Sequence, residues 1–147
     1  MTNWQTEVVI FSGILSLLIF LKGIHETYVK KNPYGLTRPL LFWGIFVWGD
    51  AVIFGIFWTL VSVAVLILKD WILFLLIISV FWVVRSFGEA IYWLNQQFST
   101  INRNPPEKLM FYKLFKNDSV WFIYQIFWQS ITVVSLIFTI YFAKIWF

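Results

Sequence analysis

The sequence predicts an all-α integral membrane protein, a bundle of four transmembrane helices in which each helix is antiparallel to its sequence neighbours. Only 12% of the 147 residues are charged and 61% are hydrophobic, whereas a soluble domain carries about 25% charged residues. The hydrophobic residues lie in long runs with few charges, near or above the roughly 17–25 residues that a helix needs to cross a bilayer. No segment alternates between apolar and polar residues as a transmembrane β-strand does.

The apolar runs set approximate bounds for the helices. The runs cover Val8–Ile24, Leu40–Leu68, Trp71–Leu94 and Val120–Ala143. From them we expect helices over residues 5–24, 40–68, 71–94 and 119–143. No Lys or Arg precedes the first run and no small-residue cleavage pattern follows it, so we expect a retained helix rather than a signal peptide. The longest polar stretch, Asn95–Ser119, is too short for a soluble domain, so we expect one transmembrane domain over residues 1–147.

The connecting segments agree with these bounds. Pro39 is tolerated in the first turn of the second helix, and only Lys69 and Asp70 separate the second helix from the third, which predicts a tight hairpin. The motif Pro105-Pro106-Glu107 predicts the start of a short amphipathic cytoplasmic helix between the third and fourth helices. A plain basic tether is the alternative. The apolar face of this short helix would consist of Met110, Phe111, Leu114 and Phe115.

The distribution of positive charge predicts the orientation in the membrane. The side of Lys69 and Lys144 has no other Lys or Arg. The loops after the first and third helices hold eight basic residues, namely Lys22, Lys30, Lys31, Arg38, Arg103, Lys108, Lys113 and Lys116. By the positive-inside rule these two loops are cytoplasmic, so we expect a multi-pass protein of the cell membrane with both termini outside the cytoplasm. The same rule accounts for the net charge of +4 without a nucleic-acid partner.

Charged residues inside the predicted spans are the most informative feature for function. Asp50 and Glu89 are about equally far from the Lys69-Asp70 turn, so we expect them at one depth. Arg85 lies one helical turn from Glu89 on the same face, and it could form an ion pair with either Glu89 or Asp50. A charge in hydrocarbon costs at least about 2.5–3.5 kcal/mol, so these three side chains should face inward.

Other helices are expected to add polar side chains at the same depth. The predicted ligand- or proton-binding patch therefore consists of Asp50, Arg85, Glu89, Gln125, Gln129, His25 and Glu26. Two central carboxylates and one guanidinium leave an excess negative charge, which a proton, a cation or an amine would neutralise. The alternative is a purely structural patch that holds the helices together. A stripe of small residues on the second helix (Ala51, Gly55, Thr59 and Ser62) also predicts close helix packing.

Several kinds of chemistry are excluded or not expected. The chain has no cysteine, which excludes disulfides, thiolate nucleophiles and Cys-ligated metals. It has no phosphate-binding glycine loop, nucleophile elbow or HExxH motif. We therefore predict no cofactor and no metal site, and we do not expect an enzyme.

The sequence leaves three functional classes open. The first is a small-solute or proton-linked transporter or binding protein whose polar pocket faces the cytoplasm. The second is a non-catalytic accessory, assembly or immunity-type membrane protein. The third is a membrane-embedded enzyme that modifies lipids. The expected partners are the lipid bilayer and either a second copy in a homodimer or a larger membrane complex.

Overall fold

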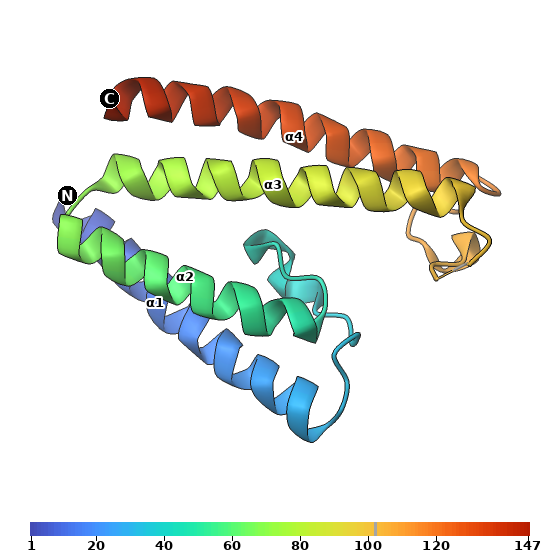
Figure 1. The fold of residues 1–147 in the computed structure, drawn as a ribbon, viewed down its shortest axis with the longest axis horizontal. Coiled ribbons are helices and arrows are strands. Elements are labelled where there is room, and N and C mark those ends of the chain that lie inside the picture. Colours follow the sequence, from blue (N-terminus) through green and yellow to red (C-terminus); the bar gives the residue numbers. More distant parts are fainter. Residues whose placement is uncertain (102) are drawn as a thin grey trace. The chain divides into compact units, whose positions relative to one another are not determined.

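The prediction of an all-α fold with four helices that can span a membrane is confirmed. The computed structural model describes residues 1–101 and 103–147, with only the backbone described for Arg38. The structure is 77% helical, and no strand occurs in these ranges. The four long helices in Figure 1 are α1 (Asn3–Ile24), α2 (Trp48–Leu68), α3 (Trp71–Phe98) and α4 (Ser119–Trp146). Each is long and apolar enough to cross a membrane.

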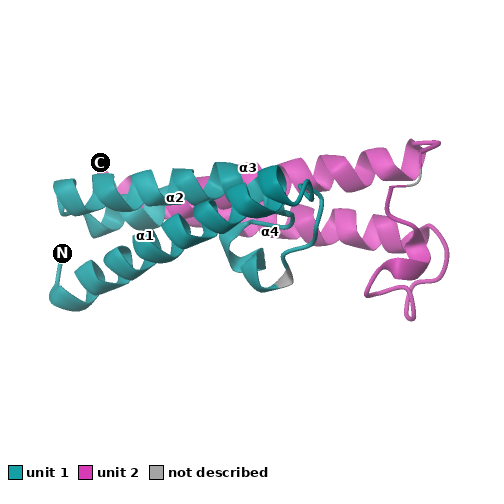
Figure 2. Ribbon diagram, turned by 90° about the horizontal axis from the view of Figure 1, so that it is seen from below, with its two compact units in different colours: residues 1–77, 146 teal, residues 78–145, 147 magenta. Residues whose placement is uncertain are grey.

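The chain divides into two compact units (Figure 2). Unit 1 contains residues 1–77 and Trp146, and unit 2 contains residues 78–145 and Phe147. The boundary falls inside α3, whose first turns belong to unit 1. The expectation of a single transmembrane domain stays a prediction.

In unit 1, α1 and α2 pack antiparallel through small residues. A Cβ atom added at Gly55 would lie 2.8 Å from the Cα atom of Phe20, and one added at Gly23 would lie 2.9 Å from the Cβ atom of Ala51. The two helix backbones therefore touch with no side chain between them. The buried residues of α2 follow the three- and four-residue spacing of a helix–helix seam, and they are Ala51, Gly55, Trp58, Val61, Ser62 and Val65. The close packing predicted from the small-residue stripe is confirmed.

The predicted start of the second helix, near residue 40, is wrong. Residues 38–43 form a short 3-10 helix that ends at Gly44, and α2 begins only at Trp48. Gly44 has a φ of 69°, a left-handed conformation that glycine adopts readily and that interrupts the helical run. Asp50 then stabilises the true start of α2, because its Oδ2 atom accepts hydrogen bonds from the backbone N–H groups of Phe46 (3.0 Å) and Val47 (3.4 Å).

Asp70 determines where α3 begins. Its Oδ1 atom accepts a hydrogen bond from the backbone N–H of Leu73 at 3.0 Å, and its Oδ2 atom accepts one from Trp146 Nε1 at 2.7 Å. The backbone N–H of Leu73 is the main cause that lowers the pKa of the Asp70 carboxyl below its usual range. The cap is therefore ionised at neutral pH, and its contribution to stability is lost only as the pH falls through that lowered pKa.

The segment between α3 and α4 begins a helix where predicted, but the helix is shorter than expected. Pro106–Lys108 form one 3-10 turn, and Leu109 has an extended backbone conformation with a ψ of 145°. Irregular turns follow as far as Phe115. The reason is tertiary packing: Leu109 and Phe111 pack against a buried cluster of Trp93, Val120 and Trp121. A regular amphipathic helix would direct its apolar face toward the leaflet instead.

Candidate functional site

Polar residues follow one side of α3 within unit 2. They run from the middle of the span to its end and are Ser79, Arg85, Ser86, Glu89, Tyr92 and Gln96. Their spacing places them along one side of the helix. Ser79, Ser86 and Gln96 are buried. This polar side of α3 is the core of the candidate site.

Arg85 and Glu89 form an ion pair, as their spacing in the sequence predicts. Arg85 Nη2 lies 3.4 Å from Glu89 Oε1, and only 18% and 16% of the two side chains are exposed. Pairing lowers the cost of placing either charge inside a membrane span. The pair therefore holds a carboxylate and a guanidinium together, about two to three helical turns before the last turn of α3.

Hydrogen bonds between side chains join α3 to α4 at two levels. The hydroxyl oxygens of Ser86 and Thr132 are 2.8 Å apart. Near the end of α3, Gln97 Nε2 donates to Gln125 Oε1 at 2.7 Å. Gln125 is thus buried and hydrogen-bonded, and its place in the predicted patch stays a prediction. The sequence analysis missed Gln97, its partner, although a buried amide on α4 requires a polar partner on the facing helix.

Two aromatic pairs also join α3 to α4. The rings of Trp82 and Trp128 stack with centroids 6.5 Å apart, and the rings of Trp93 and Tyr124 lie 4.6 Å apart at 30°. Such pairs add roughly 0.5–1.5 kcal/mol each beyond their buried area. Large side chains thus fill the space between α3 and α4.

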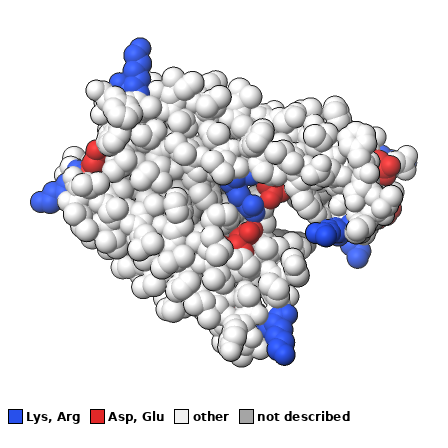
Figure 3. Space-filling view, in the orientation of Figure 1, with Lys and Arg blue, Asp and Glu red and all other residues white. Residues whose placement is uncertain are grey.

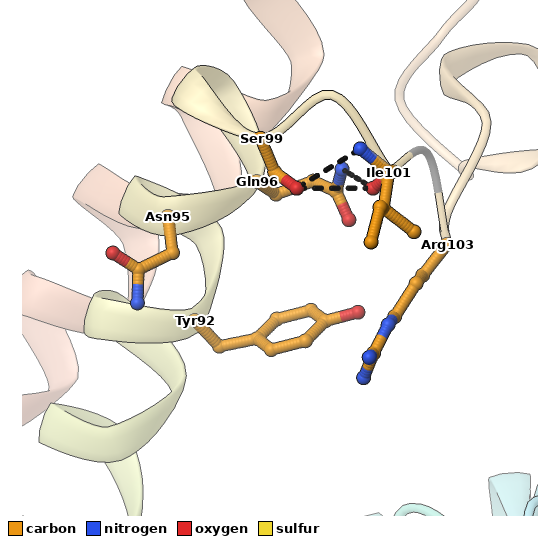
Figure 4. A pocket seen from close by; sticks show the side chains of 6 residues that line it. All are labelled: Tyr92, Asn95, Gln96, Ser99, Ile101 and Arg103. Carbon is orange, nitrogen blue, oxygen red and sulfur yellow. Dashed lines mark hydrogen bonds between the residues drawn. The ribbon is translucent and has the colours of Figure 1, made fainter.

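A pocket of about 220 Å³ opens where the polar side of α3 ends (Figure 4). It is lined by Tyr92, Asn95, Gln96, Ser99, Ile101 and Arg103. Gln96 Nε2 donates to the carbonyl oxygen of Ile101 at 3.1 Å, and the N–H of Ile101 donates to Ser99 Oγ at 3.1 Å. These bonds hold the chain after α3 against the helix and so form one wall of the pocket.

The opposite wall places a positive charge beside a phenol. Figure 4 shows the side chains of Tyr92 and Arg103 extending into the same space. The amide of Asn104 donates to the hydroxyl of Tyr92, and Trp121 Nε1 donates to the carbonyl oxygen of Asn104 at 2.9 Å. A guanidinium among hydroxyl and amide groups can bind a small polar solute, and it favours one with a carboxylate or phosphate group.

The remaining predicted site residues lie elsewhere. Gln129 is exposed on α4 in unit 2. In unit 1, Asp50 caps α2, His25 is exposed, and Glu26 forms an ion pair with Lys30 at 2.8 Å. The convergence of these unit 1 residues with Arg85 and Glu89 stays a prediction. In residues 1–101 and 103–147, no three His, Asp or Glu side chains are grouped closely enough to hold a metal ion.

Most of the visible surface carries no charge. Figure 3 shows Lys, Arg, Asp and Glu side chains at only a few places among otherwise uncharged atoms on the face that it presents. The long helices expose many large apolar side chains, among them Phe11, Leu18, Ile53, Val84, Ile137 and Ile140. Exposed apolar surface of this extent suits contact with lipid rather than with water.

Comparison with known proteins finds no family model, no curated protein and no solved structure that matches the chain.

Proposed function

We propose that the chain is a small-solute or proton-linked transport or binding protein of the cell membrane, with a solute pocket open to the cytoplasm. The observation that supports the proposal best is the polar side of α3, which runs from the Arg85–Glu89 ion pair to the pocket at Tyr92 and Arg103. Ionisable residues inside a span are costly, so they commonly mark the path of an ion, a proton or a substrate.

The ion pair suggests how proton and solute binding are linked. When Glu89 takes up a proton, its attraction for Arg85 is lost and the pair changes from neutral to positively charged. The guanidinium can then bind a small anion, and release of the proton restores the pair and displaces the anion. Arg103 in the pocket favours the same class of solute, because its charge also attracts a carboxylate or phosphate group. Because four helices enclose little space, a homodimer or larger membrane complex would complete the path.

The proposed orientation predicts the reactivity of single cysteines in a chain that has none of its own. Pro33→Cys and Asn104→Cys lie in the two cytoplasmic loops, so an impermeant maleimide added to intact cells should label neither until the membrane is opened. The control is Thr2→Cys at the opposite end, which is exposed and should be labelled from outside. Labelling of position 33 or 104 in intact cells would show that the orientation is reversed.

The proposed role of Glu89 predicts the behaviour of Glu89→Gln in proteoliposomes. Glutamine keeps the size of the side chain and an oxygen that can lie beside the Arg85 guanidinium, but it cannot exchange a proton. With an inward gradient of inorganic phosphate or acetate and an entrapped pH-sensitive dye, proton uptake should fall to the level of protein-free liposomes. Glu107→Gln, which alters an exposed carboxylate in the cytoplasmic loop, should leave the flux unchanged. Equal fluxes for Glu89→Gln and the unaltered protein would rule out the proton-linked function.

A non-catalytic accessory function has one observation in its favour. Gln129 is exposed on α4, a helix long and apolar enough to cross a membrane. An amide that faces out of a transmembrane helix gains from a hydrogen bond to a neighbouring helix, so it suits contact with a partner protein or a second copy. An accessory protein would show no proton flux in the experiment above, and Glu89→Gln would then alter its thermal stability at most.

A further inference from the structure

Residues 36–47 form a loop whose first and last residues lie next to each other. Leu36 and Val47 are paired in an antiparallel β-bridge, and the N–H of Thr37 donates to the carbonyl oxygen of Phe46 at 2.9 Å. The N–H of Trp48 donates to the carbonyl oxygen of Gly35 at 3.1 Å. The two ends of the loop therefore lie side by side next to the first turn of α2.

The loop satisfies most of its own backbone hydrogen bonds. Residues 38–43 form the 3-10 helix, after which the N–H of Gly44 donates to Leu41 O at 2.9 Å and the N–H of Ile45 donates to Leu40 O at 3.3 Å. The Thr37 hydroxyl donates to Ile45 O at 2.8 Å. Backbone polar groups of a re-entrant loop must be paired within the protein, and these bonds pair most of those in this loop.

The inner side of the loop is attached to the membrane-spanning part of unit 1. Ile45 is fully buried and packs in one cluster with Ile19 and Ala51. Leu40 and Trp43 pack partly buried against the same cluster. Ile19 lies more than one turn inside α1, so the loop reaches the level of the spanning helices rather than extending away from them.

The outer side of the loop is apolar and exposed. Phe42 is 85% exposed and Leu41 is 47% exposed, and the run from Leu40 to Phe46 contains no charged residue. On α1 and α2, exposed apolar side chains include Leu18 and Ile53, whereas the exposed Lys22 places its ammonium over the ring of Trp48, 5.0 Å from the ring centroid. The outer side of the loop thus continues the surface that the spanning helices present to lipid.

We propose that residues 36–47 are a re-entrant loop that inserts into the leaflet at this end of α1 and α2, with Phe42 among the acyl chains. The occupant of this apolar surface is therefore lipid. The loop anchors unit 1 at a fixed depth, and this role does not depend on the solute that unit 2 binds.

A matched pair of single cysteines tests the proposal. Phe42 and Tyr34 have the same exposure of 85%, but Tyr34 lies outside the bridge in the polar segment after α1. Phe42→Cys and Tyr34→Cys would each carry a nitroxide label in vesicles of phosphatidylcholine and phosphatidylglycerol. We expect the label at 42 to be relaxed strongly by oxygen, which partitions into lipid, and weakly by a water-soluble nickel chelate. The label at 34 should show the opposite pattern.

Two other outcomes would overturn the proposal. If the label at 42 reacts to the nickel chelate as the label at 34 does, the loop lies in water. If the label at 42 is shielded from both reagents, protein rather than lipid covers it. Leu41→Cys serves as a second variant should Phe42→Cys fold poorly, and the same lipid-exposed pattern is expected at that position.

Discussion

Replacing Gly55 with alanine should lower the free energy of unfolding by about 1–3 kcal/mol, the usual cost of overpacking a tight core. The added Cβ would lie 2.8 Å from the N, Cα and Cβ atoms of Phe20. Backbone atoms cannot rotate away, so α1 and α2 must move apart along the seam between them. The intrinsic helix preference of alanine offsets only about 1 kcal/mol of this loss. Unfolding in detergent micelles, followed by circular dichroism during titration with a denaturing detergent, measures the change.

Gly88 provides the matched control for this prediction. It is a helical glycine on α3 with no atom within 4 Å of the position that a Cβ would take. Gly88→Ala should therefore raise the free energy of unfolding, by roughly 0.8–1 kcal/mol from helix preference alone. If Gly55→Ala and Gly88→Ala both stabilised the protein to a similar extent, the direct backbone contact between α1 and α2 would be wrong.

The second large effect is expected at the ion pair on α3. Arg85→Leu removes the guanidinium beside Glu89 and should lower the free energy of unfolding by about 2–3 kcal/mol, because a carboxylate inside a span loses its countercharge. The double variant Arg85→Leu/Glu89→Leu places two apolar side chains there instead. It should return to within about 1 kcal/mol of the unaltered protein, since apolar residues often replace a buried pair without loss.

This prediction is tested by comparing the free energy of unfolding of the double variant with those of the single variants. A double variant more stable than Arg85→Leu shows that the two charges depend on each other inside the membrane. If the two single losses simply add, or if Arg85→Leu leaves stability unchanged, water solvates each charge separately. The same detergent titration applies to Arg85→Leu, to the second single variant Glu89→Leu and to the double variant.

The four spans could be predicted from the sequence because lipid imposes a simple rule: the backbone must satisfy its own hydrogen bonds and the side chains must be apolar. The same rule could not locate the start of α2. Residues 40–46 are equally apolar as a helix or as a loop, and the choice depends on Gly44 and on the contacts of Thr37 and Ile45 with the rest of unit 1.

The candidate site shows the same division between local and tertiary information. The Arg85–Glu89 pair follows from spacing within one helix, so it was one of the two pairings of Arg85 that the sequence indicated. The partner of Gln125 is Gln97, and this pairing depends on how α3 is rotated against α4. The pocket depends on bonds that no local pattern encodes, such as the one from Trp121 to the carbonyl oxygen of Asn104.

The two helix pairs differ in how their partners are held. Along the seam of α1 and α2, glycine sites leave no layer between the backbones, so sliding would force atoms such as those of Gly55 and Phe20 into each other. Between α3 and α4, stacked rings and long amides bridge the space. Such side chains can change rotamer, and packed helices can then shift by small shear movements. Helices α3 and α4, which carry the ion pair and the pocket, can therefore move against each other more easily than α1 and α2, whose packing is rigid.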